Sequence, residues 1–246
     1  MVPAELRDAE RTASKSQQAD DGEFSRKIDS QDEDIGSRAV IRNARELVWY
    51  PSEVDTSIRT GWFYHPEEDT DVRTADELLD IYLDAVGANA SLLLNIPPDT
   101  HGRIAAADCA SLAELGAKIQ QIFASNVTEK AEITADSAIA QHPITQAVDG
   151  MADTYWQAAY GQEFDTITLK FPKPQKVSCV VLGEHLPTGQ RIESGEIWAD
   201  ESKVAEFTVV GHKRICRFTP VDVQTLTIKI TASRTEPTLR LLEVYQ

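Results

Sequence analysis

Apolar positions recur with a helical period in two stretches of the first half of the chain. Between residues 74 and 87 they fall on one helical face, and Thr74 precedes Glu77 by the three residues of a capping box. Gly87 stands where a left-handed C-terminal cap is expected. A second apolar stripe predicts a helix from about Ala105 to Phe123, and its members are Leu112, Leu115, Ile119, Ile122 and Phe123.

Two apolar segments flank the first of these helices. One begins at Glu53, and the other, Ser91 to Ile96, is apolar almost throughout. Such a run is typical of a parallel strand that is buried on both faces. The predicted order between Glu53 and Phe123 is therefore strand, helix, strand, helix. Each strand leads into aromatic or polar groups, as at the C-terminal rim of a (β/α) barrel, and these groups are Trp62, Tyr64, His65 and Asn95.

The period changes from helical to two after a boundary placed between Asn126 and Ala131. In the segment 164–171, Ile167, Leu169 and Phe171 share one face, which predicts an antiparallel strand with one wet face. Seven short strands that follow one another about 8–12 residues apart indicate a β-sandwich. The predicted strands are Phe164–Phe171, Val177–Leu182, Gly195–Ala199, Ala205–Val210, Arg214–Phe218, Leu226–Thr231 and Thr238–Val244.

Residues 1–45 differ from the rest of the chain. The stretch Arg7 to Ile28 carries many charges and few large apolar groups, so it cannot bury enough surface to order itself alone. We expect an irregular charged segment or barrel loop here, with one short helix near Ala4 to Ser14.

The composition excludes several classes of partner. Lys and Arg number 24 against 40 Asp and Glu, a formal charge of −16, which repels nucleic acids and anionic membranes. No run of about 18 apolar residues predicts a membrane span, and Met1 to Ser16 has no apolar core of a secretory signal. The cysteines have no metal-like spacing and are expected to be buried, unreactive thiols, with a disulfide between Cys179 and Cys216 left open; the three are Cys109, Cys179 and Cys216.

Several motifs of the first half, in order and spacing, resemble one enzyme family. They are Trp49–Arg59, Gly61–His65, Val86–Ala90 and Leu92–Pro98. Together they resemble the C-terminal part of the catalytic barrel of the α-L-fucosidase family of glycoside hydrolases, over roughly Pro3 to Asn126. The segment Gln31–Ser37 resembles an insertion of bacterial members. The resemblance implies hydrolysis of terminal α-L-fucose from glycans with retention, no cofactor for catalysis, and a periplasmic or extracellular parent family.

The chain departs from that family in its catalytic motifs. A complete (β/α)₈ barrel needs about 250 residues, and retention requires two carboxyl groups about 5 Å apart. In the family the nucleophilic aspartate lies on a middle barrel strand and the acid/base glutamate follows it, and neither motif occurs here. We therefore expect a truncated reading frame, no catalytic residue in this chain, and no activity of the chain alone. The uncovered strands would associate with a missing barrel segment or another copy of the chain.

The resemblance assigns roles to several residues of the barrel remnant. Trp62 would pack on the apolar face and methyl group of fucose, although a strand tryptophan is more often core. Glu53 would orient the sugar or a catalytic partner, or form a buried pair with Arg59. His65 would bond a substrate hydroxyl, unless it is solvated. Asn95 would tie its strand end to the neighbouring loop.

The second half resembles another family. Ile144–Gly150 and Asp153–Trp156 resemble the opening of discoidin-type domains, and the match spans Ala131 to Gln246. The resemblance implies an antiparallel jelly-roll sandwich, often a carbohydrate-binding module. It also implies a structural calcium ion, which needs six to eight oxygen ligands, with the candidates Asp149, Thr154 and Glu243. The alternative is that Asp149 and Thr154 only cap turns.

The fold class predicted for the whole chain is α+β and multidomain: residues 1–45, a partial (β/α)₈ barrel over 46–126, and a jelly-roll sandwich over 131–246. Trp156 and Trp198 are expected in the sandwich core. The loop Gly183–Arg191 could hold sugar hydroxyls through His185 and Arg191, or simply be solvated. Two functions follow: a fucosidase acting on fucosylated glycans, and a non-catalytic carbohydrate-binding or accessory module.

Overall fold

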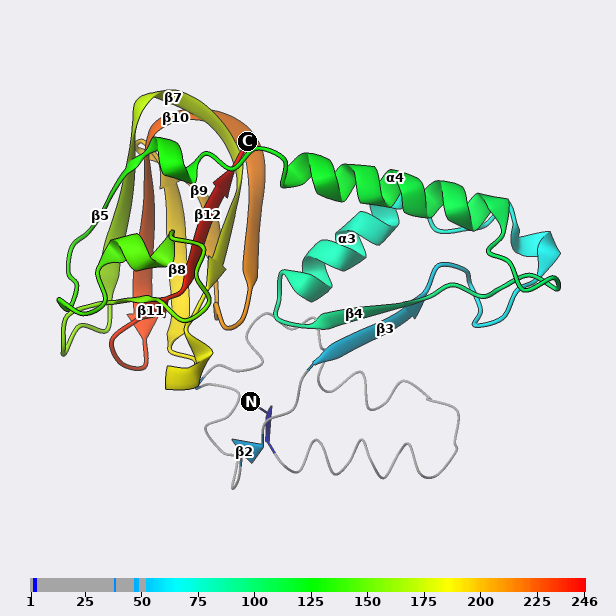
Figure 1. The fold of residues 1–246 in the computed structure, drawn as a ribbon, viewed down its shortest axis with the longest axis horizontal. Helices are drawn as coiled ribbons and strands as arrows, with labels where there is room; N and C mark the ends of the chain where they lie inside the picture. Colours follow the sequence, from blue (N-terminus) through cyan, green and yellow to red (C-terminus); the bar gives the residue numbers. More distant parts are fainter. Residues whose placement is uncertain (1, 4–37, 39–46, 49–51) are drawn as a thin grey trace.

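A computed structural model describes residues 2–3, 38, 47–48 and 52–246 (Figure 1). Within the first 51 residues it shows one short antiparallel pairing, of β1 (Val2–Pro3) with β2 (Leu47–Val48). The expected irregular segment, the helix near residues 4–14 and the insertion at 31–37 otherwise lie outside the described residues. No helix in the described part of the chain is long and apolar enough to cross a membrane.

Residues 53–122 form two strand–helix units. Their elements are β3 (Glu53–Ser57), the 3₁₀ turn η1 (Pro66–Glu68), α3 (Ala75–Val86), β4 (Ser91–Asn95) and α4 (Ala106–Ile122). β3 and β4 pair in parallel, with Glu53 opposite Ser91 and Ser57 opposite Asn95. The predicted order of strand, helix, strand, helix is therefore confirmed. The membership of these units in a complete barrel stays a prediction.

The ends of α3 are set by local chemistry. The Thr74 hydroxyl accepts a bond from the Glu77 amide, and the Glu77 carboxylate accepts one from the Thr74 amide, so the predicted capping box is present. The prediction of a left-handed cap at Gly87 is wrong, because its φ is −75°. Glycine is needed there for space, since a Cβ would lie 2.2 Å from the Leu83 carbonyl oxygen and 3.0 Å from Cβ of Ile215.

The two helices cover one face of the β3–β4 pair (Figure 1). A small core lies between them, and its members are Ile58, Ala75, Leu78, Leu79 and Leu115, with the partly buried Leu94 and Ile96 packed against it. The expectation that Ser91 to Ile96 is buried on both faces is wrong, because the burial alternates and Leu93 is 50% exposed. The face of the strand pair that carries Leu93 lacks a helical cover among the described residues.

The β part follows α4 and begins after the 3₁₀ turn η2 (Thr128–Lys130). Its strands are β5 (Glu132–Ala135), β6 (Trp156–Gln157), β7 (Asp165–Gly183), β8 (Ile192–Ala199), β9 (Ser202–Phe207), β10 (Arg214–Ser233), β11 (Thr238–Leu239) and β12 (Leu241–Tyr245). The main sheet has the order β12-β7-β10-β8-β9, with β5 also paired to β7, and β6 pairs with β11. The turns η3 (Ile144–Ala147) and η4 (Leu186–Thr188) lie between strands.

Four of the seven predicted strands merge into two longer ones, and the sequence missed β5 and β6. The strand predicted at 205–210 lies at 202–207, and the one predicted at 238–244 is divided into β11 and β12. Segments 164–171 and 177–182 belong to the single strand β7, and segments 214–218 and 226–231 belong to β10. The β7–β10 ladder shifts register between Arg217 and Val221 and between Val223 and Thr225, where both strands bend (Figure 1). Because of the bend, both halves of each strand contribute to one core.

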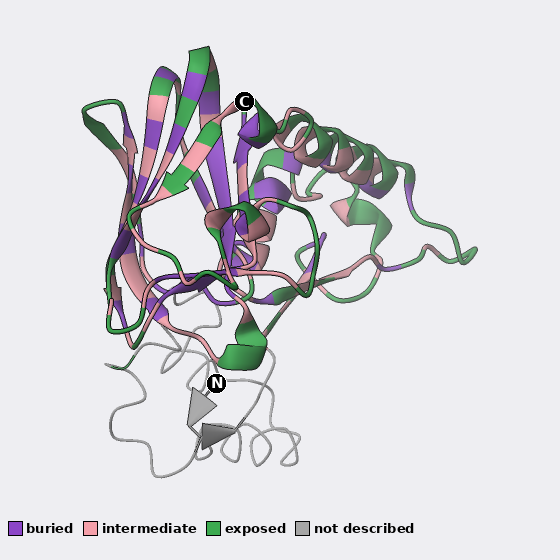
Figure 2. Ribbon diagram, turned by 60° about the vertical axis from the view of Figure 1, so that its left-hand side comes forward, coloured by how far each residue is buried: buried purple, intermediate pink, exposed green. Residues whose placement is uncertain are grey.

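That core is the larger of the molecule, and Figure 2 shows its buried residues alternating with exposed ones along the strands. Ile167, Leu169 and Phe171 are all buried, as their spacing predicts. Trp156 is fully buried, as expected, whereas Trp198 is only partly buried on the outer face, with Nζ of Lys229 4.1 Å from the ring centroid. The expected jelly-roll topology and the boundary near residues 126–131 stay predictions.

The three cysteines differ in their burial. Cys179 and Cys216 are buried and free, and they belong to different apolar clusters on opposite faces of the sheet, so the disulfide left open by the sequence is not formed. Burial raises the pKa of the Cys179 thiol to about 12. Cys109 is exposed, so the expectation that it is buried is wrong.

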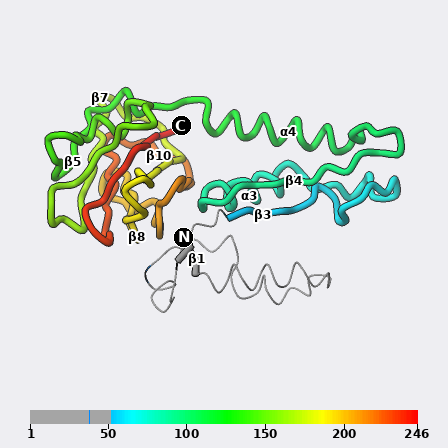
Figure 3. The backbone as a smooth tube through the Cα atoms, turned by 60° about the horizontal axis from the view of Figure 1, so that its bottom comes forward, coloured from blue at the N-terminus to red at the C-terminus, as the bar shows by residue number. Residues whose placement is uncertain are grey.

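The end of α4 joins the helical part to the β part, and the two parts lie next to each other along the long axis of the molecule (Figure 3). Ile122 packs against the core of the helices and also against a cluster on the outer face of the sheet. The Phe123 ring meets the Tyr245 ring edge-on at 5.2 Å between centroids. The amide of Val127 then donates to the Val244 carbonyl at 2.8 Å.

Candidate functional site

The loop that follows β3 presents exposed aromatic side chains. Trp62 is 51% exposed and Phe63 is 78% exposed. At the end of β4, Nδ2 of Asn95 donates to Oγ of Ser57 and to the carbonyl oxygen of Trp62, both at 3.1 Å. The prediction that Trp62 and Asn95 lie together at the ends of the two strands is therefore confirmed.

The base of the same loop is held by a buried guanidinium. Arg59 has a fully buried side chain, and it donates from Nε and Nη2 to the two carboxylate oxygens of Asp108 at 3.1 and 2.8 Å. Nη2 also contacts Asp69 at 2.7 Å, and Nη1 donates to the His65 carbonyl oxygen at 3.2 Å. The hydrogen bond to Asp108, more than any other contact, raises the pKa of Arg59. This fork-to-fork pairing fixes both ends of the segment 59–65.

The Tyr64 ring covers the other side of this guanidinium. The Arg59 Cζ lies 4.7 Å from the ring centroid, and the Tyr64 hydroxyl donates to Asp69 at 3.3 Å. Tyr64 is thus part of the support of the loop, and its hydroxyl is engaged within it.

Glu53 lies at the other end of β3. It is the first residue of the strand and pairs with Ser91, whereas the candidate site is at Ser57 and Asn95. With a rise of about 3.3 Å per residue, four residues separate these ends by roughly 13 Å. The expectation that Glu53 faces the rim is not met, and its expected pairing with Arg59 is wrong because Asp108 and Asp69 hold that group.

His65 is exposed and precedes η1. Its Nδ1 lies 4.0 Å from a carboxylate oxygen of Glu67, and only its backbone carbonyl takes part in the Arg59 network. A contact of its ring with a substrate hydroxyl stays a prediction.

Sequence reasoning missed the residues that hold the loop in place. Asp108 lies in the first turn of α4 and is 49 positions from Arg59, so no local pattern links the two. An acidic residue in a first helical turn is ordinary, because it favours the helix dipole. Ser57 was equally unremarkable in the sequence, although it is 94% buried and bonded to Gly61 and Asn95.

The loop Gly183–Arg191 of the β part is occupied by internal contacts. The His185 ring stacks on Tyr155 at 3.9 Å between centroids, and Tyr155 stacks on His142 at 3.9 Å. Nη1 of Arg191 donates to the Glu236 carbonyl at 2.8 Å. Burial lowers the pKa of His185. These contacts of His185 and Arg191 stabilise the loop. Sugar binding by the two residues stays a prediction.

A buried carboxylate supports the same loop. Glu184 is fully buried, and its oxygens accept bonds from the amides of Arg191 (2.6 Å), Ile192 (2.9 Å) and Gly211 (2.6 Å). Burial raises the pKa of this carboxyl to about 7, against the effect of the three amides. Its place is structural, because it ties the loop to the turn before β10.

The candidate calcium ligands are engaged in short-range bonds. The Thr154 hydroxyl donates to both carboxylate oxygens of Asp149 at 2.9 and 2.8 Å, and the Met151 amide donates to Asp149 at 2.9 Å. Glu243 accepts a bond from the Tyr245 hydroxyl at 2.9 Å. The contacts of Asp149 match the turn-capping alternative. No group of three or more His, Cys, Asp or Glu side chains suited to a metal occurs among the residues the structure describes.

Calcium removal should therefore leave stability unchanged if Asp149 only caps its turn. We expect the thermal midpoint of the chain to be the same with a calcium chelator as with added calcium. Differential scanning calorimetry measures both midpoints. A higher midpoint with calcium, lost in the variant Asp149→Asn, would instead establish a bound ion.

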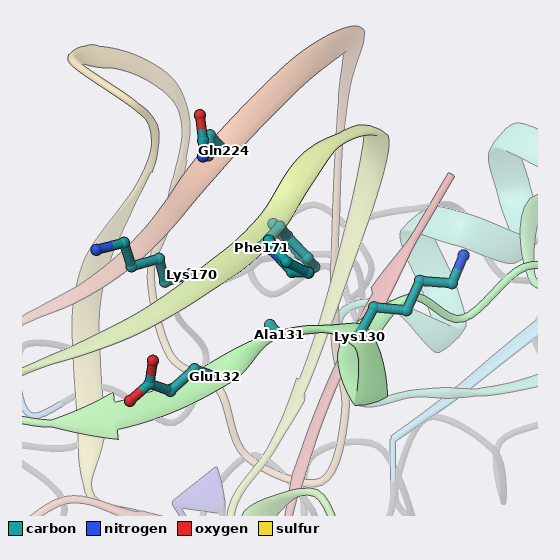
Figure 4. Close-up of a pocket in the computed structure, with 7 residues that line it drawn as sticks. Lys130, Ala131, Glu132, Lys170, Phe171 and Gln224 are labelled. Atoms are coloured by element: carbon teal, nitrogen blue, oxygen red, sulfur yellow. The ribbon is translucent and has the colours of Figure 1, made fainter.

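A hollow of about 430 Å³ lies where η2, β5, β7 and β10 come together (Figure 4). Its lining residues are Lys130, Ala131, Glu132, Lys170, Phe171, Pro172 and Gln224. Glu132 and Lys170 are register partners on neighbouring strands. Together with Lys130 they give the lining two positive charges and one negative charge, so the hollow has a small positive excess.

Comparisons with known proteins place the geometry in context. Residues 10–121 match the family described as Alpha-L-fucosidase. Alpha-L-fucosidase 1 of Arabidopsis thaliana is 32% identical over 209 residues, which are 80% of this chain and 41% of the plant protein. This chain thus spans about two fifths of the length of that relative.

The solved structures that resemble this chain include fucosidases as well. A candidate α-L-fucosidase of Bacteroides thetaiotaomicron has a TM-score of 0.77 and 29% identity, over 84% of this chain and 47% of its own. A Ruminococcus gnavus fucosidase of glycoside hydrolase family 29, in complex with fucose, has a TM-score of 0.75 and 27% identity, over 82% of this chain and 42% of its own. The chain is therefore similar to α-L-fucosidases in sequence, with the family match in its N-terminal half, and in the fold of its described residues.

Proposed function

We propose that this chain is part of an α-L-fucosidase-type glycoside hydrolase, and that the ends of β3 and β4 contact a terminal α-L-fucose of a fucosylated glycan. The family match over residues 10–121 supports this proposal. So does the likeness to a fucosidase that was solved with fucose.

The observation that carries the proposal is an exposed aromatic ring on a fixed loop. Trp62 is half exposed, yet the backbone around it is bonded to Asn95 on one side and to Arg59 on the other. Fucose has an apolar face and a methyl group, and an indole ring offers a flat apolar surface for them. A loop ordered before the ligand arrives loses less entropy on binding.

We assign no catalytic role to the described carboxylates beside this loop. Retaining glycosidases need a nucleophile and an acid/base about 5 Å apart on either side of the bond that is cleaved. Asp108 is fully buried and bonded to Arg59, and Asp69 is bonded to Arg59 and Tyr64. Both carboxylates thus compensate the guanidinium, and this part of the chain is proposed to bind the sugar without cleaving it.

An accessory role for the β part is the second proposal. α4 ends against β12, through the Phe123–Tyr245 ring contact and the bond from Val127 to Val244. These contacts support a function in which the sheet braces the helices behind the Trp62 loop.

The test is fucose binding by the whole chain, followed by ligand-observed NMR. We expect L-fucose to bind and the variant Trp62→Ala to weaken binding about tenfold, the effect of about 1.4 kcal/mol. The control Tyr160→Ala removes another exposed aromatic ring, 77% exposed in the β part, and should bind as the original chain does.

The catalytic part of the proposal has its own measurement. We expect the chain to release no nitrophenol from 4-nitrophenyl α-L-fucoside above the rate in buffer. Turnover that survives purification to a single species would contradict the assignment of no catalytic carboxylate. Equal binding by the original chain and Trp62→Ala would contradict the fucose contact.

A further inference from the structure

We propose that Asn95 is a positioning residue, which holds the Trp62 loop in the orientation that meets the sugar. This inference rests on the proposed function for the identity of the ligand. It adds a residue whose side chain acts through the backbone of Trp62 and does not itself touch the ligand.

The carboxamide of Asn95 is fully used as a donor. One Nδ2 atom carries two N–H groups, and it is 3.1 Å from both Oγ of Ser57 and the carbonyl oxygen of Trp62. The Ser57 hydroxyl in turn donates to the Gly61 carbonyl at 2.8 Å. Asn95 therefore fixes two successive carbonyls, those of Gly61 and Trp62, one of them directly and one through Ser57.

The tip of the loop has one further side-chain bond, from the Thr60 hydroxyl to Asp71 at 3.1 Å, and little packing. Trp62 and Phe63 are both exposed, and a Cβ placed on Gly61 would meet no atom within 4 Å. A glycine in open space is free to take many backbone conformations. The bonds from Asn95 and Ser57 replace the packing that usually fixes a loop, so the orientation of Trp62 depends on them.

The base of the loop has anchors of its own, and it shares one bond with the Asn95 network, from the Arg59 amide to Oγ of Ser57 at 3.3 Å. Arg59 binds Asp108, Asp69 and the His65 carbonyl, and none of these groups touches Asn95. The backbone of Asn95 is also independent of its side chain, since its carbonyl accepts from the Ile58 amide at 3.0 Å. A change of the Asn95 side chain should then release the tip while the strands and the base stay in place.

The test replaces the donor with an isosteric acceptor, in Asn95→Asp. The carboxylate would face the Trp62 carbonyl and repel it, because neither oxygen can donate. The matched control is Asn126→Asp, since Oδ1 of Asn126 only accepts, from the Thr128 amide at 2.9 Å, and an aspartate keeps that bond. Both variants add the same charge.

Two measurements follow on the whole chain labelled with 5-fluorotryptophan. The ¹⁹F resonance of Trp62 is identified by its loss in Trp62→Phe. Without ligand, we expect Asn95→Asp to shift and broaden that resonance, with the resonance of the buried Trp156 unchanged and Asn126→Asp without effect. The Kd for L-fucose should rise about tenfold in Asn95→Asp, and Trp62→Ala should be no weaker when Asn95→Asp is added to it.

The outcomes separate the two proposals. An unchanged Trp62 resonance in Asn95→Asp would overturn the positioning role, as would losses that multiply in the double variant, which would mean a direct contact of Asn95 with the sugar. If fucose does not bind to the original chain, the proposed function fails, and the ligand-free spectra still decide the positioning role. Should Asn95→Asp not fold, Asn95→Ser, too short to reach both acceptors, gives the same ligand-free comparison.

Discussion

Replacing Asp108 with alanine should destabilise the helices of this chain by about 3 kcal/mol. The Arg59 and Asp108 side chains are both fully buried and share two hydrogen bonds. Removal of one partner leaves a buried charge without compensation, which typically costs about 3–5 kcal/mol. We expect the lower end, because Asp69 also binds Arg59 and is 43% exposed.

Urea unfolding followed by the circular dichroism of α3 and α4 measures this effect. The matched control is Asp76→Ala, which breaks the ion pair with Lys118 at 2.9 Å, in which Asp76 is 78% exposed. An exposed pair contributes little, so the control should leave the midpoint nearly unchanged. The double variant Arg59→Met with Asp108→Leu should recover much of the loss. Equal midpoints for Asp108→Ala and Asp76→Ala would show that the buried pair does not stabilise this part.

The second large effect is expected at Trp156. The side chain is fully buried in the core of the β part, and its Nε1 donates to the Ser137 carbonyl at 3.0 Å. Trp156→Ala should lower the free energy of unfolding by about 3–5 kcal/mol, because it removes a large apolar side chain and leaves a cavity. Trp156→Phe should cost about 1–3 kcal/mol, since it leaves the Ser137 carbonyl without a donor.

Thermal melting followed by the circular dichroism of the strands measures the Trp156 effect. Trp198→Ala is the control, because that ring lies partly buried on the outer face between Glu196 and Lys229. It should cost clearly less than Trp156→Ala. A larger loss in Trp198→Ala would mean that the outer face contributes more to stability than the core.

Local chemistry explains why α3 could be predicted and part of β7 could not. The capping box of Thr74 and Glu77 needs only two residues that are three positions apart, and the structure forms it as expected. The alternation of apolar residues is interrupted at the bends of β7 and β10, so the sequence pattern predicts two short strands in place of each long one. The continuity of the backbone through a bend depends on the neighbouring strand, which no short window of sequence contains.

The sequence predicted where the candidate site lies. It did not predict which residues hold the Trp62 loop in place. Trp62 and Asn95 meet because parallel strands bring their carboxyl ends to one edge, a rule that the sequence order already implies. Glu53 was misplaced because it starts the strand that Ser57 ends. The Arg59–Asp108 pair joins distant positions, and only the packing of α4 on the strands brings them together.

The pairing of β7 with β10 bears on the order in which the molecule acquires its structure. Their ladder joins residues 182 and 214 at one end and residues 165 and 230 at the other, so long stretches of chain must close before it is complete. The contacts of α3 with β4 span much shorter separations, because β4 begins five residues after α3 ends. The contacts of α3 with α4 do not, since the Asp76–Lys118 pair joins residues 42 positions apart. Because short loops close sooner, we expect α3 to pack on β4 before α4 is added and before the β7–β10 ladder is complete. β12 pairs with β7 at the edge of the sheet over a comparably long stretch of chain.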